Sequence, residues 1–390
     1  MRGTSSNTTE LADIFGKYGE EYSRSHYTTY EQRKAMKAIS DCRTSKMGGN
    51  KLQCTYCGNQ ELSYNSCRNR NCPKCGYVKQ IKWAEKLKSS LIPVRHFHVV
   101  FTLPRELRAL IYINQEICYN ILFKSSSQAL QQAALNPEFL GAETGFIAIL
   151  HTWTQDLRFH PHVHMIVPAG GLDIDGMEWK HSQKKFFVPV RALSKMYRAK
   201  FIESLMKEYR NGNLKIPPII NGINYGYFEN LEKILREKEW NVYTKRAFGG
   251  VSKVVGYLAR YTNRVAITNS RIISMEGSKV KFRWKDYKSS VQWKQMELYA
   301  DEFIKRFLFH VLPSGFYKIR YFGILACVNN KTKKMQSFLL LKAFLKGSFY
   351  EVLLWHEVLL KAEGKDLLLC PVCKKGRMVQ KGKLAGDKFG

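Results

Sequence analysis

The sequence predicts an α+β protein in which helices flank a central antiparallel sheet. Strand-like runs rich in β-branched and aromatic residues occupy residues 96–104, 145–155 and 162–171. Only residues 156–161 separate the last two runs, which indicates a β-hairpin with a five- or six-residue connection. Helical stretches lie between the strands without a regular βαβ alternation, and this favours α+β over a doubly wound sheet.

The composition excludes wholesale disorder and points to a polyanionic partner. Of the 390 residues, 45% are hydrophobic and 13% aromatic, enough to bury a core. Lys and Arg number 63 against 32 Asp and Glu, a net charge of +31, so nucleic acid is the expected partner rather than a membrane surface. With no apolar run of about 18 residues and no signal-peptide core at the start, a soluble cytoplasmic protein is expected.

Further elements follow from periodicity and turn residues. Helices are expected at residues 28–40, 78–92, 105–134, 191–210, 228–238, 251–266 and 301–312. A strand pair is expected around residues 278–287, and Pro313 stops the last helix. The chain then divides into a cysteine-bearing N-terminal domain (1–92), a sheet domain (93–270) and a basic C-terminal region (271–390).

The cysteines of the first domain have the spacing of metal ligands. Two Cys-x-x-Cys pairs, Cys54/Cys57 and Cys72/Cys75, are 14 residues apart, which is close to the spacing of a zinc ribbon and predicts one tetrahedral Zn²⁺ site. A segment poor in aliphatic residues needs such a metal to hold it together. Zinc ligands are sought among six cysteines: Cys42, Cys54, Cys57, Cys67, Cys72 and Cys75.

The remaining cysteines leave the number of zinc ions open. Cys42 and Cys67 would need two further ligands to form a second site, and no histidine lies nearby. Cys370 and Cys373 form half a site near the C-terminus and are not assigned. Between the two Cys-x-x-Cys pairs, Arg68 and Arg70 are candidate DNA contacts, although a solvated basic face explains each of them equally well.

Two histidines on the third strand are candidate ligands for a second kind of metal. His162 and His164 lie two residues apart, so both rings face the same side of a strand. Two neutral imidazoles suit a divalent ion that keeps positions open for substrate oxygens. If the hairpin turns across residues 156–161, Gln155 falls opposite His162 and is the candidate third ligand, with His151 and His160 as rivals.

Two tyrosines at helical spacing are candidate nucleophiles. Tyr257 and Tyr261 are four residues apart and share one helix face, beside the basic residues Lys253, Arg260 and Arg264. Tyrosines at this spacing usually belong to a core, but small and charged residues separate these two. A phenol attacks a phosphodiester when a metal polarises the phosphate. The product is a phosphotyrosine ester that conserves the energy of the broken bond, so a strand is rejoined without ATP.

The chain resembles the rolling-circle transposases with paired tyrosines, which belong to the HUH (histidine–hydrophobic–histidine) endonuclease superfamily. The resemblance covers about residues 30–325 and rests on NSCRNRNCPKC, HVVFTLP, LHTWTQDLRFHPHVHMIVPAGGL, YLARYTNRVAITNSRI, FRWKDY and EFIKRFLFHVLPSGF. It implies that His162 and His164 bind Mg²⁺ or Mn²⁺ and that Tyr257 and Tyr261 are the nucleophiles. It also implies that the histidines lie on a middle strand, faced by the tyrosine helix.

The resemblance implies a transposase that nicks and rejoins single-stranded DNA at the ends of an insertion element through a 5′-phosphotyrosine intermediate. Asn50 and Asn71 stand where this family often has histidine, which argues against a second zinc. Arg68, Arg70, Lys253, Arg260 and Arg264 are the expected DNA contacts. Base stacking is sought among four aromatic residues, each of which is more often a core residue: Trp153, Trp284, Tyr287 and Trp293.

Three other functions compete with this one. A plasmid relaxase or replication initiator would use the same chemistry in another biological role. A nucleotide hydrolase with a histidine nucleophile would explain residues 160–164 but not the cysteines or tyrosines. A non-catalytic zinc-dependent DNA-binding protein would explain the charge and the cysteines but not the histidine and tyrosine pairs. A transposase with three catalytic carboxylates is disfavoured because acidic residues are scarce. The sequence does not indicate an oligomeric state.

Overall fold

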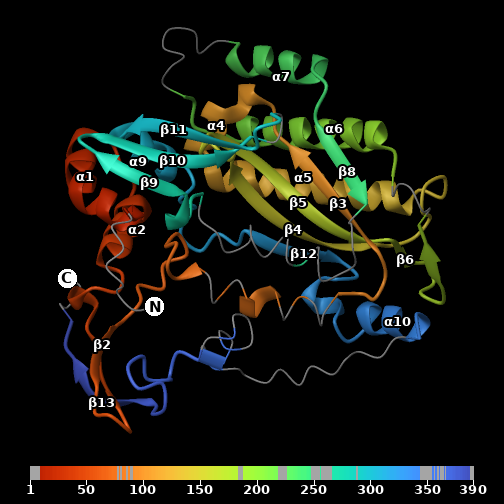
Figure 1. The fold of residues 1–390 in the computed structure, drawn as a ribbon. Coiled ribbons are helices and arrows are strands. Elements are labelled where there is room, and N and C mark those ends of the chain that lie inside the picture. Colours follow the sequence, from red (N-terminus) through yellow and green to blue (C-terminus); the bar gives the residue numbers. More distant parts are fainter. Residues whose placement is uncertain are drawn as a thin grey trace.

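The computed structural model describes residues 9–386, except for 77–78, 80, 85–86, 88–90, 183–187, 218–225, 247–254, 256–265, 287–288, 343–353, 355, 358–359, 361–363 and 365. Figure 1 shows a curved sheet at the centre with helices packed on it, and a small sheet near the two chain ends. The predicted α+β class is confirmed.

Five strands form the central sheet in the order β12-β4-β5-β3-β8, and every pairing is antiparallel. The strands are β3 (His96–Thr102), β4 (Gly145–Trp153), β5 (Phe159–Pro168), β8 (Val242–Arg246) and β12 (Ile319–Gly323). The sheet therefore contains the three strands that the sequence predicts and two edge strands, β8 and β12, that it does not. The histidine-bearing strand β5 is the middle strand, as the resemblance implies.

The β4–β5 hairpin sets which side chains face which side of the sheet. Its connection is residues 154–158, which agrees with the predicted length of five or six residues but lies earlier in the chain than the predicted 156–161. His151 pairs with His162 and Ile149 with His164, so these four side chains share one face because opposed residues in antiparallel strands point the same way. The alternate residues, such as Leu150 and Val163, point to the other face.

The face opposite the histidines carries the main hydrophobic core. Phe101, Val163 and Met165 from the sheet pack there with Leu122 of α5 and Phe201 of α6, all of them fully buried. Figure 1 shows α5 and α6 lying together against this face. The helices of this layer are α4 (Arg108–Ile113), α5 (Gln115–Leu135), α6 (Val190–Arg210) and α7 (Tyr227–Glu237).

The histidine face is apolar away from the histidines. Ile147, Ile149 and Ile166 pack there against Leu87 and Val255 in a separate buried cluster. Val255 is fully buried and helical. Val255, which falls within the predicted 251–266 helix, therefore lies on the same face of the sheet as the histidines.

A second core joins the first helices of the chain to residues 266–311. Helices α1 (Leu11–Ser25) and α2 (Tyr30–Asp41) pack against α9 (Ala300–Leu308) and a sheet of order β11-β10-β9. These strands are β9 (Ile272–Glu276), β10 (Lys279–Lys285) and β11 (Trp293–Tyr299). Residues from the predicted N-terminal and C-terminal regions thus share one hydrophobic core, which the sequence alone does not predict.

A small three-stranded sheet lies next to this core and contains the first and the last strand of the chain. Its order is β13-β1-β2, with β1 (Gly49–Cys54), β2 (Gln60–Tyr64) and β13 (Met378–Leu384). Figure 1 shows the N and C labels close together beside it. The C-terminal strand therefore completes the cysteine-bearing N-terminal domain.

The remaining elements are short or lie at the periphery. They are β6 (Gly170–Leu172), β7 (Trp179–His181), α10 (Lys333–Leu340) and the 3₁₀ turns Ser45–Met47, Arg105–Leu107, Asn269–Arg271 and Cys327–Asn329. Among the helices that the structure describes, none combines the length and apolar character that a bilayer crossing demands.

A buried histidine fixes the segment after α9 to the sheet. His310 Nε2 lies 3.1 Å from the carbonyl oxygen of Leu157, and Nδ1 lies 3.1 Å from the hydroxyl of Thr152. Because a carbonyl oxygen only accepts, Nε2 carries the proton and Nδ1 accepts from Thr152. The ring is therefore neutral, and burial lowers the pKa of His310 to about 4.

We expect acid to destabilise the protein between pH 6.5 and 4. In this window the unfolded chain binds a proton at residue 310 that the folded chain does not, so the free energy of unfolding falls as the pH falls. Burial also lowers the pKa of His96 to about 4, so it acts in the same direction. Thermal unfolding at pH 7 and pH 5 should show a smaller loss of Tm for His310→Gln than for the wild type, whereas exposed His181→Gln should match the wild type. An unchanged pH dependence in His310→Gln would contradict the assignment.

Candidate metal and DNA site

Three histidines from β4 and β5 meet on one face of the sheet. His151, His162 and His164 each offer one ligand nitrogen, and these nitrogens all lie within 4.8 Å of one another. The ring centroids are 4.2 Å apart for His151 and His164 and 4.8 Å apart for His162 and His164. A single divalent cation could therefore be held by three imidazoles, with the rest of its coordination left for substrate.

Backbone and side-chain contacts orient two of these rings. His162 Nδ1 lies 2.6 Å from the carbonyl oxygen of His160, so Nδ1 is the protonated nitrogen and the lone pair is on Nε2. His164 Nδ1 lies 2.7 Å from Nε2 of His98 on β3, and the two rings are parallel within 2°. This contact leaves His164 Nε2 available to a cation. If His164 binds a metal, His98 is a positioning residue of the kind that metal-binding histidines usually have.

The surroundings keep the three rings neutral, as metal binding requires. Burial lowers the pKa of His162 to about 4 and the pKa values of His151 and His164 well below the ordinary range for histidine. The neighbouring histidines lower each pKa further, because a second positive charge within the cluster is unfavourable. At neutral pH each of the three rings therefore keeps one unprotonated nitrogen, whose lone pair can bind a metal.

The predicted register of the hairpin is wrong, and this changes the third residue of the cluster. Gln155 lies in the turn after Trp153, whereas His151 stands opposite His162. An irregularity between His151 and Trp153 shifts the pairing, so that Trp153 pairs with Phe159. The Gln155 carbonyl accepts a hydrogen bond from Arg271. Of the two rivals, His151 joins the cluster, and His160 contacts Arg108 through Nδ1 at 3.4 Å.

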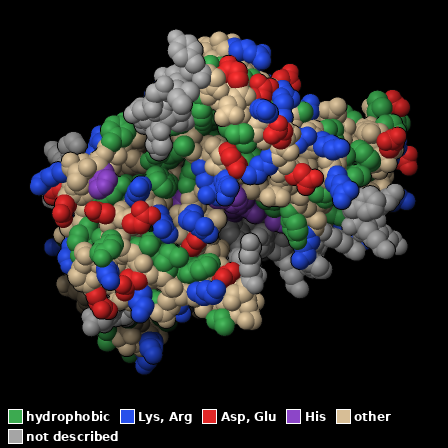
Figure 2. Space-filling view, turned by 90° about the horizontal axis from the view of Figure 1, so that it is seen from above, with side chains coloured by type: hydrophobic (Ala, Val, Ile, Leu, Met, Phe, Trp, Pro, Cys, Tyr) green, Lys and Arg blue, Asp and Glu red, His purple; other side chains and the backbone are tan. Residues whose placement is uncertain are grey.

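Arginines gather beside His160 at the edge of the cluster. Burial lowers the pKa of Arg108, and the positive charges of Arg158 and Arg105 lower it further. The Nε of Arg108 is buried and has no hydrogen-bond partner among the described residues. Arg158 forms an ion pair with Asp156 at 2.6 Å, and Arg105 forms one with Glu106 at 3.3 Å. Arg108 differs from both, because no carboxylate of the described residues lies within ion-pair distance of it. Figure 2 shows histidine side chains near the middle of this view, bordered by Lys and Arg.

The predicted nucleophiles lie outside the described residues. Tyr257, Tyr261, Lys253, Arg260 and Arg264 all belong to segments that the structure does not describe, and so does Tyr287. Val255, two residues before Tyr257, is the nearest described residue and packs in the cluster with Ile149 and Ile166.

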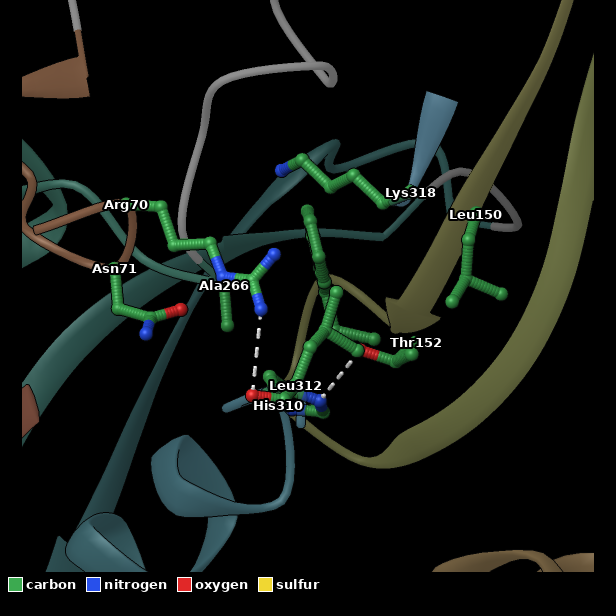
Figure 3. A pocket seen from close by; sticks show the side chains of 9 residues that line it. Arg70, Asn71, Leu150, Thr152, Ala266, His310, Leu312 and Lys318 are labelled. Atoms are coloured by element: carbon green, nitrogen blue, oxygen red, sulfur yellow. Dashed lines mark hydrogen bonds between the residues drawn. The ribbon is translucent and has the colours of Figure 1, made fainter. Parts of the chain in front are cut away.

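Arg70, another predicted DNA contact, forms hydrogen bonds within the protein. Arg70 donates to the carbonyls of Phe316 at 2.7 Å and Pro313 at 2.5 Å, which fastens the cysteine loop to the segment before β12. Figure 3 shows Arg70 and Lys318 reaching into a cavity of about 20 Å³, which is room for roughly one water molecule. Burial and the charge of Arg70 lower the pKa of Lys318 to about 8. Leu150 and Thr152 line this cavity, so it lies across β4 from His151 and is not part of the histidine cluster.

The remaining stacking candidates differ in exposure. Trp153 packs against the second core and stacks on His151, with centroids 5.1 Å apart. Trp284 also packs against that core, whereas the side chain of Trp293 is exposed.

Arg68, another predicted DNA contact, has a neighbour through its backbone: its carbonyl oxygen accepts a hydrogen bond from Lys79 Nζ at 3.2 Å.

Eight cysteines form two groups of four. In each group the four sulfur atoms lie within 4.8 Å of one another, which suits a tetrahedral thiolate site for zinc. The first group is Cys42, Cys67, Cys72 and Cys75, and the second is Cys54, Cys57, Cys370 and Cys373. The predicted pairing of Cys54 and Cys57 with Cys72 and Cys75 is therefore wrong. The spacing identified the Cys-x-x-Cys pairs but not which pairs share a site, because Cys370 lies 313 residues after Cys57.

Comparison with known proteins identifies the class. Residues 145–333 match the family described as "Putative transposase", and residues 14–103 match the family described as "Transposase zinc-binding domain". The chain is 40% identical over 374 residues to "Putative transposase y4qJ" of Sinorhizobium fredii (strain NBRC 101917 / NGR234), with 95% of this chain and 94% of that protein covered. It is 28% identical over 291 residues to "Transposase for insertion sequence element IS801" of Pseudomonas savastanoi pv. phaseolicola, with 73% and 68% covered.

Two solved structures of a conjugative relaxase, TrwC, in complex with oriT DNA are also similar. The copper-bound structure has 12% identity and a TM-score of 0.27, and the match covers 65% of this chain and 95% of the relaxase chain. The metal-bound structure has 13% identity and a TM-score of 0.26, with 66% and 96% covered.

The sequence matches define a transposase with a zinc-binding domain, and the cysteine groups agree with that domain. The chain belongs to the transposase family that includes y4qJ and the IS801 transposase.

We expect His98→Ala to weaken Mn²⁺ binding about 10- to 100-fold, the usual cost of removing a residue that orients a metal ligand. Isothermal titration of the wild type, His98→Ala and His98→Gln with Mn²⁺ measures this. The glutamine amide can bond to the same His164 nitrogen and should restore much of the affinity. Unchanged Mn²⁺ affinity in His98→Ala would contradict this expectation and would show that His164 needs no hydrogen-bond partner to bind the metal.

Proposed function

We propose that this transposase nicks and rejoins single-stranded DNA at the ends of an insertion element, with the chemistry of an HUH endonuclease. The observation that carries the proposal is the convergence of His151, His162 and His164 on one face of the sheet, with their nitrogens within 4.8 Å. Mg²⁺ or Mn²⁺ held by these nitrogens would polarise the scissile phosphate and neutralise charge that develops on its oxygens.

The chain's own groups would orient the phosphate and protect the cluster from water. Arg108 offers a buried guanidinium nitrogen beside His160, and a DNA phosphate is an acceptor of matching charge. Trp153 stacks on His151 and covers one side of that ring. A basic edge next to the histidines supports a bound polyanion, and the net charge of +31 supports it for the whole chain.

Tyr257 and Tyr261 are the proposed nucleophiles. The phenol oxygen of one tyrosine attacks phosphorus, the phenol gives up its proton, and the bond to the 3′-oxygen breaks, so that the strand ends in a protonated 3′-hydroxyl. The new ester joins the 5′-phosphate to tyrosine and keeps the energy of the phosphodiester. Attack by another 3′-hydroxyl reverses the step and joins a new strand. Val255, two residues before Tyr257, packs on the histidine face, so the chain reaches this side of the sheet just before the tyrosines in the sequence.

The same chemistry in a plasmid relaxase or replication initiator is the second candidate. Family membership favours transposition, because the relatives over most of the chain are transposases. A non-catalytic DNA-binding protein is the third, and it gives no role to three oriented, neutral imidazoles.

The test is a covalent adduct. Purified protein with Mn²⁺ and labelled single-stranded oligonucleotides from the element's ends should give a species that survives denaturing gel electrophoresis, and peptide mapping should place the DNA on Tyr257 or Tyr261. Tyr257→Phe with Tyr261→Phe should abolish the adduct, and His162→Ala should reduce it at least 100-fold, because both variants lack a group that acts on the phosphate.

Tyr27→Phe is the matched control, because Tyr27 is an exposed tyrosine between α1 and α2 that the proposal leaves without a role. Cleavage without an adduct would mean that water is the nucleophile, and binding without cleavage would favour the non-catalytic alternative.

A further inference from the structure

The second group of four cysteines joins the two ends of the chain. Cys54 Sγ lies 3.6 Å from Cys373 Sγ, and Cys57 Sγ lies 3.7 Å from Cys370 Sγ. With Zn–S bonds of about 2.3 Å, a tetrahedral site places its sulfurs about 3.8 Å apart. The spacing thus matches four thiolates around one Zn²⁺. The matched zinc-binding domain ends at residue 103 and contains only half of this group.

Both Cys-x-x-Cys segments have the backbone of a metal-binding turn. The amides of Tyr56 and Cys57 lie 3.4 and 3.5 Å from Cys54 Sγ, and the amide of Gly376 lies 3.4 Å from Cys373 Sγ. Such N–H donors stabilise a negatively charged sulfur. Gly376 is needed for space, since a Cβ there would lie 2.5 Å from Cys54 Sγ.

Side-chain packing alone explains little of this arrangement. The buried cluster around the four sulfurs consists of Cys54, Cys370 and Met378, with only Leu52 and Cys373 partly buried against it. Beyond Met378, every residue of strand β13 is exposed or half-buried. A cluster of this size does not stabilise a strand against the loss of chain entropy, whereas a structural zinc ion does.

We propose that Cys54, Cys57, Cys370 and Cys373 bind a second structural Zn²⁺ that docks the C-terminal strand onto β1. The ion completes the sheet β13-β1-β2 and closes the chain from residue 54 to residue 370 into a loop. The zinc-binding domain is therefore discontinuous in sequence and is complete only once residues 370–384 have been made.

Zinc content and amide exchange test this proposal in the full-length protein. The wild type should hold two zinc ions per chain. The double variants Cys370→Ser/Cys373→Ser and Cys54→Ser/Cys57→Ser should each hold one, and the combination of all four should still hold one. In each variant the amides of residues 378–384 should lose most of their protection against hydrogen exchange, while those of β4 and β5 keep theirs.

Two controls keep the result interpretable. Cys327→Ser, an exposed cysteine outside both groups, should retain two zinc ions. Cys373→His should also retain two, because a Cys₃His site binds zinc, and this separates ligand loss from misfolding. Two zinc ions in Cys370→Ser/Cys373→Ser, or zero in the fourfold variant with β4 and β5 still protected, would overturn the proposal.

Discussion

The pairing of His151 with His162 is the constraint on which the candidate site depends. Strand side chains alternate between faces, so a slip of one residue would turn these rings into the helix-packed core and bring Leu150 and Val163 out of it. The large apolar surface on that side therefore fixes the register. The same free energy of burial that holds α5 and α6 on the sheet holds three imidazoles together on its other side.

Hydrogen bonds lower the free-energy cost of burying two of the three histidines. The carbonyl of His160 fixes the tautomer of His162, and His98 takes up one nitrogen of His164. Burial then disfavours the doubly protonated, charged form of each ring, so that one nitrogen of each keeps its lone pair for a cation. At the edge, Arg108 remains charged although partly buried, which is costly without a counter-ion and would be relieved by a bound phosphate.

Local patterns predicted much of the fold, and long-range pairing explains what they missed. The two-residue spacing of His162 and His164 was sufficient to place both on one face, and the short connection was sufficient to predict a hairpin, although not its position. Which residue stands opposite them depended on an irregularity after His151, which no sequence pattern revealed. The partners of Cys54 also could not be read from spacing, because pairing of β1 with β13 brings Cys370 to it. Helix α1 was missed although its buried residues, such as Leu11, Ile14 and Phe15, have helical spacing.

Counting the imidazoles on bound Mn²⁺ tests the central claim most directly. Pulsed electron paramagnetic resonance of the Mn²⁺-loaded protein resolves the ¹⁴N couplings of coordinated histidine. The account predicts three coupled imidazoles in the wild type, two in His151→Ala, and three in Gln155→Ala. Two imidazoles in the wild type, with no change in His151→Ala, would contradict it and would mean that the register of β4 and β5 does not select the third ligand.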